Sequence, residues 1–135
     1  MGFEKFGRRS FTSQTKVAPF VDYLEKGELR GTRCKSCGKQ YFPPRADCAA
    51  CLSNEMEWYK IEGPGTLISF TRAGFAPTGF EEDVPYTLAL VDFNGTKVFG
   101  RLEKDIPEAE VSVGMQLKVT PCTLSNGQLS YEFVK

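Results

Sequence analysis

The sequence contains no histidine. A Ser–His or Cys–His nucleophile pair and a histidine-ligated metal are therefore impossible within this chain. Histidine is also the commonest general base at neutral pH, so catalysis would depend on Lys, Asp, Glu, Tyr or a cysteine. This absence favours a non-catalytic module over an enzyme.

Net charge and long hydrophobic runs are missing as well. Lys plus Arg is 17 and Asp plus Glu is 17, and this balance disfavours nucleic-acid or lipid binding through bulk charge. No apolar run approaches the about 18 residues of a membrane span. The first 16 residues also lack the apolar core of a signal peptide. We therefore expect a cytoplasmic protein without a membrane segment.

The composition is that of an ordinary globular protein. The chain has 135 residues, of which 41% are hydrophobic, enough for one domain or two very small ones. The charge is uneven, because residues 1–60 carry 11 basic and 7 acidic side chains, whereas residues 61–135 carry 6 and 10. Two modules with different neighbours would explain this asymmetry, and so would chance in a short chain.

Four of the five cysteines form one pattern. Cys34 and Cys37 are separated by two residues, as are Cys48 and Cys51, and ten residues lie between the two pairs. Each short spacer allows a tight turn to direct two thiolates at one ion, so the pattern predicts a tetrahedral metal site. Gly38 supplies the permissive backbone for such a turn. With a short strand over Gln40–Phe42 between the pairs, this is the layout of a zinc ribbon.

Other interpretations of the cysteines are weaker. Two disulfides would need an oxidising compartment, and a thioredoxin-like redox pair uses only one such motif. Iron in a rubredoxin-like site remains an alternative to zinc, because thiolates also bind iron. Four sulfur ligands leave no position open for water, so the ion would be structural, one Zn²⁺ per chain. The fifth cysteine, Cys122, is predicted to be a buried strand residue.

The rest of the chain predicts an arm, a helix and a small barrel. Residues 1–16 form an apolar-basic arm, in which Phe3, Phe6 and Phe11 occur together with Arg8, Arg9 and Lys16. Val17, Phe20, Val21 and Leu24 have helical spacing, with Gly27 as the C-terminal cap. Leu29–Arg33 reads as a strand entering the first cysteine pair. Five further β-branched or alternating runs predict strands, at Thr66–Thr71, Tyr86–Phe93, Thr96–Leu102, Met115–Thr120 and Leu129–Val134.

The predicted fold class is mainly β. Five strands close best into a barrel, and a long connection before the last hairpin fits an OB-fold. An SH3-like barrel or a small sandwich is the alternative. The expected division is an arm and helix over residues 1–27, a rubredoxin-like zinc ribbon over 28–60 and the barrel over 61–135, with Trp58 and Tyr59 at the junction.

These parts together resemble the zinc-ribbon and OB-fold proteins associated with acyl-CoA enzymes. The resemblance extends from about Phe20 to the C-terminus. Its ribbon motif, with Pro-Pro-Arg between the cysteine pairs, is specific, whereas the barrel motifs are weak. The matching segments are Gly27–Gly38, Phe42–Arg45, Cys48–Cys51, Gly63–Leu67, Val84–Tyr86 and Val113–Met115.

The resemblance implies a companion role. Members are small subunits of thiolase-type complexes, which include acyl-CoA thiolases such as one for benzoylsuccinyl-CoA, a hydroxymethylglutaryl-CoA synthase assembly and thiolase-like steroid aldolases. The catalytic residues lie in the large partner, and the small subunit supports the complex and the acyl-CoA site or its entrance. We therefore expect no catalytic residue in this chain and a hetero-oligomer with a thiolase-like subunit.

Two sets of residues are candidates for contact with the partner or with acyl-CoA. Phe75 and Phe80 lie in the longest loop between adjacent barrel strands, where exposed aromatics favour an interface, although both rings could instead fold back onto the barrel. In the same loop Glu81, Glu82 and Asp83 are expected to remain in water. Arg33, Lys39 and Arg45 surround the cysteine pairs, with Lys35. They could bind CoA phosphates, or, slightly favoured, balance the charge of a zinc held by four thiolates.

Two other functions remain open at the level of sequence. OB-folds and zinc ribbons also bind single-stranded nucleic acid, but the zero net charge and the acidic barrel disfavour this alternative. A rubredoxin-like electron carrier would require iron. The favoured prediction is a non-catalytic accessory subunit of a thiolase-like acyl-CoA enzyme, whose partner could be a thiolase, a condensing enzyme or a retro-aldolase.

Overall fold

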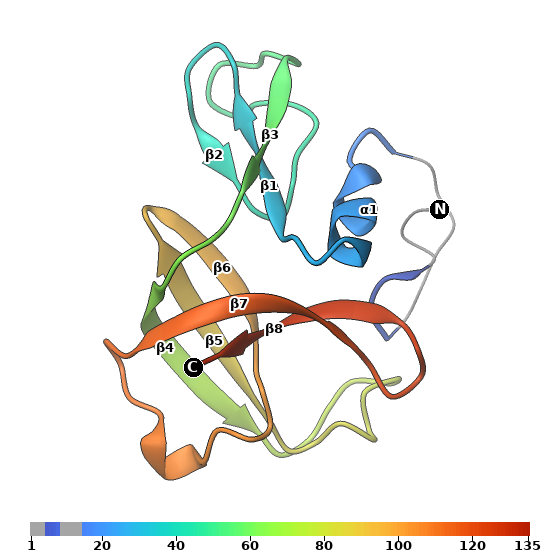
Figure 1. Cartoon of the computed structure of the whole chain (residues 1–135), viewed down its shortest axis with the longest axis vertical. Coiled ribbons are helices and arrows are strands. Elements are labelled where there is room, and N and C mark those ends of the chain that lie inside the picture. Colours follow the sequence, from blue (N-terminus) through green and yellow to red (C-terminus); the bar gives the residue numbers. More distant parts are fainter. Residues whose placement is uncertain (1–4, 9–14) are drawn as a thin grey trace.

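The computed structural model describes residues 5–8 and 15–135. One short helix, α1 (Pro19–Glu25), precedes a three-stranded sheet and a five-stranded barrel (Figure 1). The predicted fold class, mainly β with an N-terminal helix, is confirmed. Of the predicted arm, Phe3, Arg9 and Phe11 lie outside the described residues.

The helix ends where the sequence predicts and begins at Pro19, two residues after Val17, the first residue of the predicted periodic pattern. Proline occupies its first turn, where a missing N–H costs nothing, and the buried residues are Phe20, Val21 and Leu24. Gly27 has φ of +86°. Its N–H donates to the carbonyl of Leu24 at 3.0 Å, and the N–H of Glu28 donates to that of Tyr23 at 2.9 Å. These two bonds form a Schellman cap, which ends the helix and turns the chain toward β1.

The small sheet carries the cysteine pairs. It contains β1 (Arg30–Cys34), β2 (Gln40–Tyr41) and β3 (Met56–Lys60), in the order β2-β1-β3 with antiparallel pairing. The sequence predicted β1 and β2 but not β3, whose residues show no clean alternation of burial. Pairing with β1 along its whole length, from Arg30 opposite Lys60 to Cys34 opposite Met56, makes β3 a strand.

The barrel consists of five strands in the closed order β4-β5-β6-β8-β7. This order, with β6 and β8 parallel and all other pairs antiparallel, is that of an OB-fold and excludes the SH3-like and sandwich alternatives. The strands are β4 (Gly65–Ala73), β5 (Tyr86–Phe93), β6 (Thr96–Leu102), β7 (Gln116–Thr123) and β8 (Leu129–Val134).

The tight turn between β5 and β6 follows from its sequence. Asn94 and Gly95 both have positive φ, 54° and 94°, as a two-residue hairpin between β5 and β6 requires. The connection from β6 to β7 is longer and contains a 3₁₀ turn, η2 (Glu108–Glu110). Ile106 in this connection is 7% exposed and belongs to the barrel core, so the connection covers one end of the barrel.

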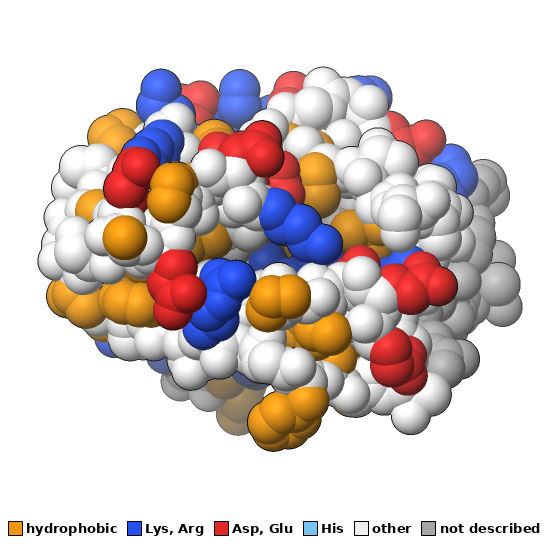
Figure 2. Space-filling model, turned by 90° about the horizontal axis from the view of Figure 1, so that it is seen from below, with side chains coloured by type: hydrophobic (Ala, Val, Ile, Leu, Met, Phe, Trp, Pro, Cys, Tyr) orange, Lys and Arg blue, Asp and Glu red, His pale blue; other side chains and the backbone are white. Residues whose placement is uncertain are grey.

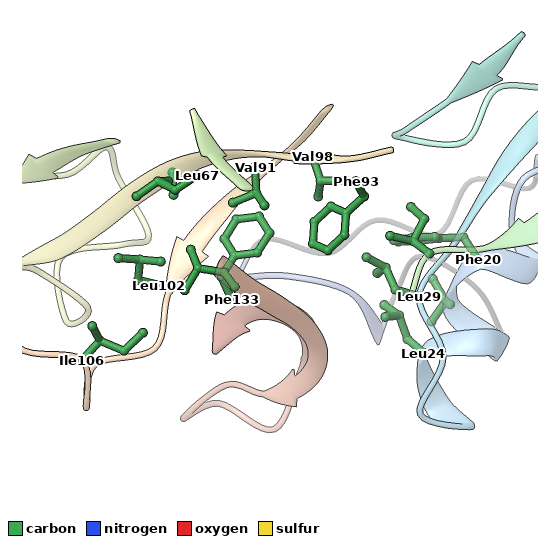
Figure 3. Packing of buried hydrophobic residues seen from close by; sticks show 14 residues of the cluster. Phe20, Leu24, Leu29, Leu67, Val91, Phe93, Val98, Leu102, Ile106 and Phe133 are labelled. Atoms are coloured by element: carbon green, nitrogen blue, oxygen red, sulfur yellow. The ribbon is translucent and has the colours of Figure 1, made fainter. Parts of the chain in front are cut away.

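One hydrophobic core joins the helix to the barrel. Figure 3 shows Phe133 beside Val91 and Leu67 in the barrel, while Phe20, Leu24 and Leu29 lie on the side of α1. All of these residues belong to one buried cluster, and Phe93 lies between the two groups. The ribbon adds a small cluster of its own, Cys34, Tyr41 and Cys48, with Met56 packed against it. The helix therefore packs as part of the barrel core.

The junction between sheet and barrel is polar as well as aromatic. Trp58 packs against Tyr23 of α1 with ring centroids 5.4 Å apart. The Tyr59 hydroxyl donates to Thr96 Oγ1 of β6 at 3.1 Å. The Thr96 hydroxyl donates in turn to Gln40 Oε1 of β2 at 2.8 Å. Trp58 and Tyr59 thus lie at the junction, as expected from the sequence. The part of the chain that the structure describes contains no candidate membrane-spanning helix.

Candidate functional site

The four cysteines of the predicted metal site converge on one point. Cys34 ends β1, and the N–H of Gly38, at φ of +81°, donates to its carbonyl at 2.9 Å. The second pair has the same turn, because the N–H of Leu52, at φ of 64°, donates to the carbonyl of Cys48 at 2.9 Å. The sequence indicated the glycine but not Leu52, which adopts the left-handed conformation at a steric cost.

The sulfur geometry fits a tetrahedral ion. The four Sγ atoms lie within 4.8 Å of one another, and the Sγ atoms of Cys34 and Cys51, like those of Cys37 and Cys48, are 3.5 Å apart. Zn–S bonds of about 2.3 Å give a tetrahedron with edges of about 3.8 Å. Disulfide sulfurs would lie about 2.05 Å apart, and all five cysteines are free. The cluster is consistent with structural zinc.

Neighbouring donors favour the thiolate form of two of these cysteines. The hydroxyl of Tyr41 lies 3.3 Å from Cys48 Sγ and lowers the pKa of that thiol to about 6. The backbone N–H of Cys37 donates to Cys34 Sγ at 3.5 Å and lowers the pKa of Cys34. Thiolates are the form that binds metal. The sequence did not single out Tyr41, whose hydroxyl also accepts the N–H of Ala49 at 2.9 Å.

The donor set allows one kind of chemistry. Four sulfur ligands complete a tetrahedral coordination sphere, so a zinc ion held here would stabilise the fold and leave no position for substrate or water. The segment around it has a core of only three buried residues. A segment with so little core depends on the metal for its structure.

The structure does not gather the five predicted contact residues into one site. Lys39 and Arg45 both lie over the ring of Tyr41, at 5.6 and 5.5 Å from its centroid. Arg33 lies 5.5 Å from the centroid of Tyr59 and pairs with Glu57 at 2.8 Å, beside a different hollow at the junction of sheet and barrel. The two phenylalanines are on the loop between β4 and β5.

The two loop phenylalanines have different surroundings. Phe75 is 88% exposed. Phe80 is half-buried and lines an apolar groove of about 330 Å³. The main rings and side chains around that groove are Phe6, Phe80, Tyr86, Leu88, Phe99 and Tyr131. Figure 2, which views the molecule from below, shows hydrophobic side chains at the surface in several places among acidic and basic ones.

Asp83 is buried, contrary to the expectation that it remains in water. Its side chain is 12% exposed, and its Oδ2 lies 3.1 Å from Arg8 Nε and 3.4 Å from Arg101 Nη1. Neither Arg8 Nε nor Asp83 Oδ2 has an aligned hydrogen bond among the described residues, so charge attraction holds this pair. Glu82, also in contact with Arg8, is 80% exposed as expected.

The arm closes one side of the groove. Phe6 packs against Phe20 and Tyr131 at centroid distances of 5.5 and 6.5 Å. The N–H of Gly7 donates to the carbonyl of Leu129, and Arg8, which is only 7% exposed, also donates to Ser125 Oγ at 3.3 Å. The sequence marked the arm only by its apolar-basic composition, and it revealed neither that the arm packs on the barrel of its own chain nor which acid Arg8 meets.

Cys122 offers no nucleophile. It lies in β7, half-buried, and burial raises the pKa of its thiol to about 11. Such a thiol is protonated at neutral pH, and only the thiolate attacks.

Comparison with protein families identifies the chain. Residues 22–57 match the family described as ChsH2, rubredoxin-like zinc ribbon domain, and residues 58–120 match ChsH2, C-terminal OB-fold domain. The chain therefore belongs to the ChsH2/DUF35 family of zinc-ribbon and OB-fold proteins. The family and the fold predicted from the sequence are confirmed.

Several curated relatives support this assignment. The chain is 36% identical over 92 residues to a DUF35 domain-containing scaffold protein of Methanocaldococcus jannaschii, covering 67% of the chain and 64% of the relative. It is 35% identical to a scaffold protein of the same description from Pyrococcus furiosus, covering 72% and 71%. It is 32% identical to the benzoylsuccinyl-CoA thiolase subunit BbsA of Thauera aromatica, covering 56% and 51%.

The fold also has a solved counterpart. The chain superposes on a chain of the structure described as Ltp2-ChsH2(DUF35) aldolase with a TM-score of 0.75, covering 92% of this chain and 98% of the other. The two sequences are 22% identical. At this identity the likeness establishes the fold.

Proposed function

We propose that this chain is a non-catalytic accessory subunit of a thiolase-like acyl-CoA enzyme, where it supports the complex and borders the acyl-CoA site. The observation that carries the proposal is the apolar groove with the exposed loop beside it. Phe80 of the β4–β5 loop and Phe99 of β6 line the groove, and Phe99 is 57% exposed. Phe75, on the same loop as Phe80, is 88% exposed. Exposed rings of this kind are typical of a surface that another protein covers.

Two further observations support a non-catalytic role. The chain has no histidine, and the thiol of its spare cysteine is protonated at neutral pH. The four-cysteine cluster leaves no ligand position for a substrate. Kinship with a thiolase subunit of Thauera aromatica and with DUF35 scaffold proteins supplies the class of partner.

Within this proposal the five predicted contact residues divide into two groups. Phe75 and Phe80 contact the partner or the acyl group at the groove. Lys39 and Arg45, which lie over the ring that contacts Cys48, balance the charge of the zinc–thiolate centre. Arg33 is paired with Glu57 and contributes least to either role. We also propose residues 28–60 and 61–135 as the two structural modules, because β3 ends at Lys60 and β4 begins at Gly65.

Co-purification tests the proposal. The tagged chain is expressed in its source organism, and mass spectrometry identifies what accompanies it. We expect a thiolase-type protein in near-stoichiometric amount and no acyl-CoA turnover by the isolated chain. Recovery of the chain without such a protein, or turnover by the chain alone, would overturn the proposal.

Matched variants locate the interface. Phe75→Ser and Phe99→Ser remove exposed rings beside the groove and are expected to weaken the complex about tenfold or more, as loss of an aromatic anchor does. Val113→Ser is the control, because Val113 is 65% exposed in the connection before β7 and is not part of the groove. Equal weakening by all three variants would count against a specific surface.

A further inference from the structure

The second half of β4 has a neighbour on one edge only. On one side β4 pairs with β5 as far as Ala73, but on the other it pairs with β7 only at Gly65 and Thr66. The last backbone bonds on that side join Leu67 to Met115 and Gly114, at 2.9 and 2.8 Å. Figure 1 shows β4 and β7 diverging from this shared start. Beyond Leu67 this edge has neither a paired strand nor another backbone partner among the described residues.

The pairing with β5 identifies which backbone groups face the open edge. Leu67, opposite Val91, directs its N–H and C=O away from β5, toward Met115 and Gly114. Hydrogen-bonded and non-hydrogen-bonded pairs alternate along β5, so the residues opposite Ala89 and Thr87 also direct their groups outward. These residues are Phe70 and Arg72.

Exposure of the side chains agrees with an uncovered strand. Consecutive side chains of a barrel strand alternate between core and solvent, yet every residue from Ile68 to Arg72 is exposed. Ile68 is 37% and Phe70 is 40% exposed. The nearby turn η2 contacts this strand through an ion pair between Glu108 and the Arg72 guanidinium, 3.3 Å apart. Long exposed edges with apolar side chains are sites where another strand adds.

We propose that the open edge of β4, Ile68–Ala73, accepts an extended segment of the thiolase-like partner subunit as an added strand. This inference rests on the proposed function and names how the partner engages the barrel. Strand addition satisfies the outward backbone groups of Phe70 and Arg72, and an apolar side chain on the added strand would cover Ile68 and Phe70.

The extent of the edge decides between a partner and a second copy. A stable interface engages about 20–30 residues on each side, whereas this edge offers the six residues from Ile68 to Ala73. Pairing of two such edges would not hold two copies together by itself. The edge instead supplements a complex held elsewhere, which fits a larger subunit that also covers Phe75 and Phe99.

Amide hydrogen exchange resolved to single residues tests the proposal. In the free chain, the amides of Phe70 and Arg72 should exchange fast, while those of Thr71 and Ala73, which face β5, are protected. In the complex with the co-purified thiolase-type subunit, exchange at Phe70 and Arg72 should slow about fivefold or more, as one net hydrogen bond would require. If the complex forms and the amides of Phe70 and Arg72 still exchange fast, this proposal is overturned and the proposed function stands.

A pair of variants tests the backbone separately from the side chain. Arg72→Ala removes the side chain and keeps the outward N–H, whereas Arg72→Pro also removes that N–H, at an edge position where proline is tolerated. We expect Arg72→Pro to weaken the complex about tenfold relative to Arg72→Ala. Equal binding would overturn the proposal.

The remaining outcomes are also decisive. If Arg72→Pro does not fold, the exchange measurement alone decides. A concentration-dependent dimer of the isolated chain that Arg72→Pro abolishes would assign the edge to a second copy and overturn the partner strand. If no thiolase-type protein is recovered, the proposed function and this inference fall together.

Discussion

At the residue scale, two buried polar side chains make contacts on which the metal site and the barrel depend. The hydroxyl of Tyr41 lies against a cysteine sulfur, and the carboxylate of Asp83 lies between two guanidinium groups. Both side chains are largely buried. Buried polar groups are costly unless partners compensate them, so each is expected to matter more than a surface residue of the same type.

Tyr41→Phe should weaken zinc binding. Without the hydroxyl, the pKa of Cys48 rises from about 6 toward its ordinary value, so protons compete with the metal at higher pH. We expect zinc affinity to fall about tenfold, as for other residues that support metal ligands, and zinc release to move to higher pH. Competition with a chromophoric chelator between pH 5 and pH 8 measures both. Tyr86→Phe, in the barrel, is the control, and equal release curves for the two variants would contradict the assignment.

Asp83→Asn should destabilise the fold. It leaves the guanidinium groups of Arg8 and Arg101 without their shared carboxylate, and loss of one partner of a buried ion pair costs about 3 kcal/mol. Urea unfolding measures the loss. Glu82→Gln is the matched control, because Glu82 also contacts Arg8 but is 80% exposed, and we expect a change below about 0.5 kcal/mol. Similar values for both variants would show that the burial of Asp83 is unimportant.

At the element scale, short segments depend on their caps and partners. The helix α1 has only 7 residues, which is too short for stability in isolation. Its Schellman cap and its three buried side chains hold it on the barrel. The cap therefore controls the path from α1 into β1 and the first cysteine pair.

Gly27→Ala should cost about 1 kcal/mol. Gly27 has φ of +86°, and an added Cβ there meets nothing within 4 Å, so the whole penalty comes from the left-handed backbone. Gly74→Ala is the control, since that position is equally open and its φ is not in the left-handed range. Thermal unfolding compares the two, and an equal loss of stability would mean that the cap is not responsible.

The sequence predicts elements with strong local signals and misses those defined by distant pairing. The hairpin at Asn94-Gly95 and the cap at Gly27 follow from residues that tolerate positive φ. By contrast, β3 becomes a strand only through its pairing with β1, and the turn at Leu52 has no glycine to mark it. The cysteine spacing predicts the cluster, but no local pattern shows that Asp83 meets Arg8, because these residues are 75 positions apart.

At the scale of the whole molecule, the helix and the small sheet are built into the barrel. The helix shares the barrel's hydrophobic core, and Tyr59, Thr96 and Gln40 form a hydrogen-bonded chain from β3 to β6 and β2. The arm is also attached to the barrel, through the contact of Arg8 with Asp83. A protein linked in this way transmits a loss of structure in the ribbon to the barrel.

Removal of zinc should therefore destabilise the entire chain. We expect a chelator, or Cys34→Ser, to lower the unfolding temperature of the whole chain. Trp58 fluorescence reports the ribbon, and amide exchange at Phe133, which is 0% exposed, reports the barrel. Both probes should still show the same single transition. Cys122→Ser, outside the cluster, should leave zinc content and unfolding unchanged. Tyr59→Phe removes the hydrogen bond from Tyr59 to Thr96 and should lower the free energy of unfolding by about 1 kcal/mol. Two separate transitions, with the barrel unaffected by zinc removal, would show that the ribbon folds independently.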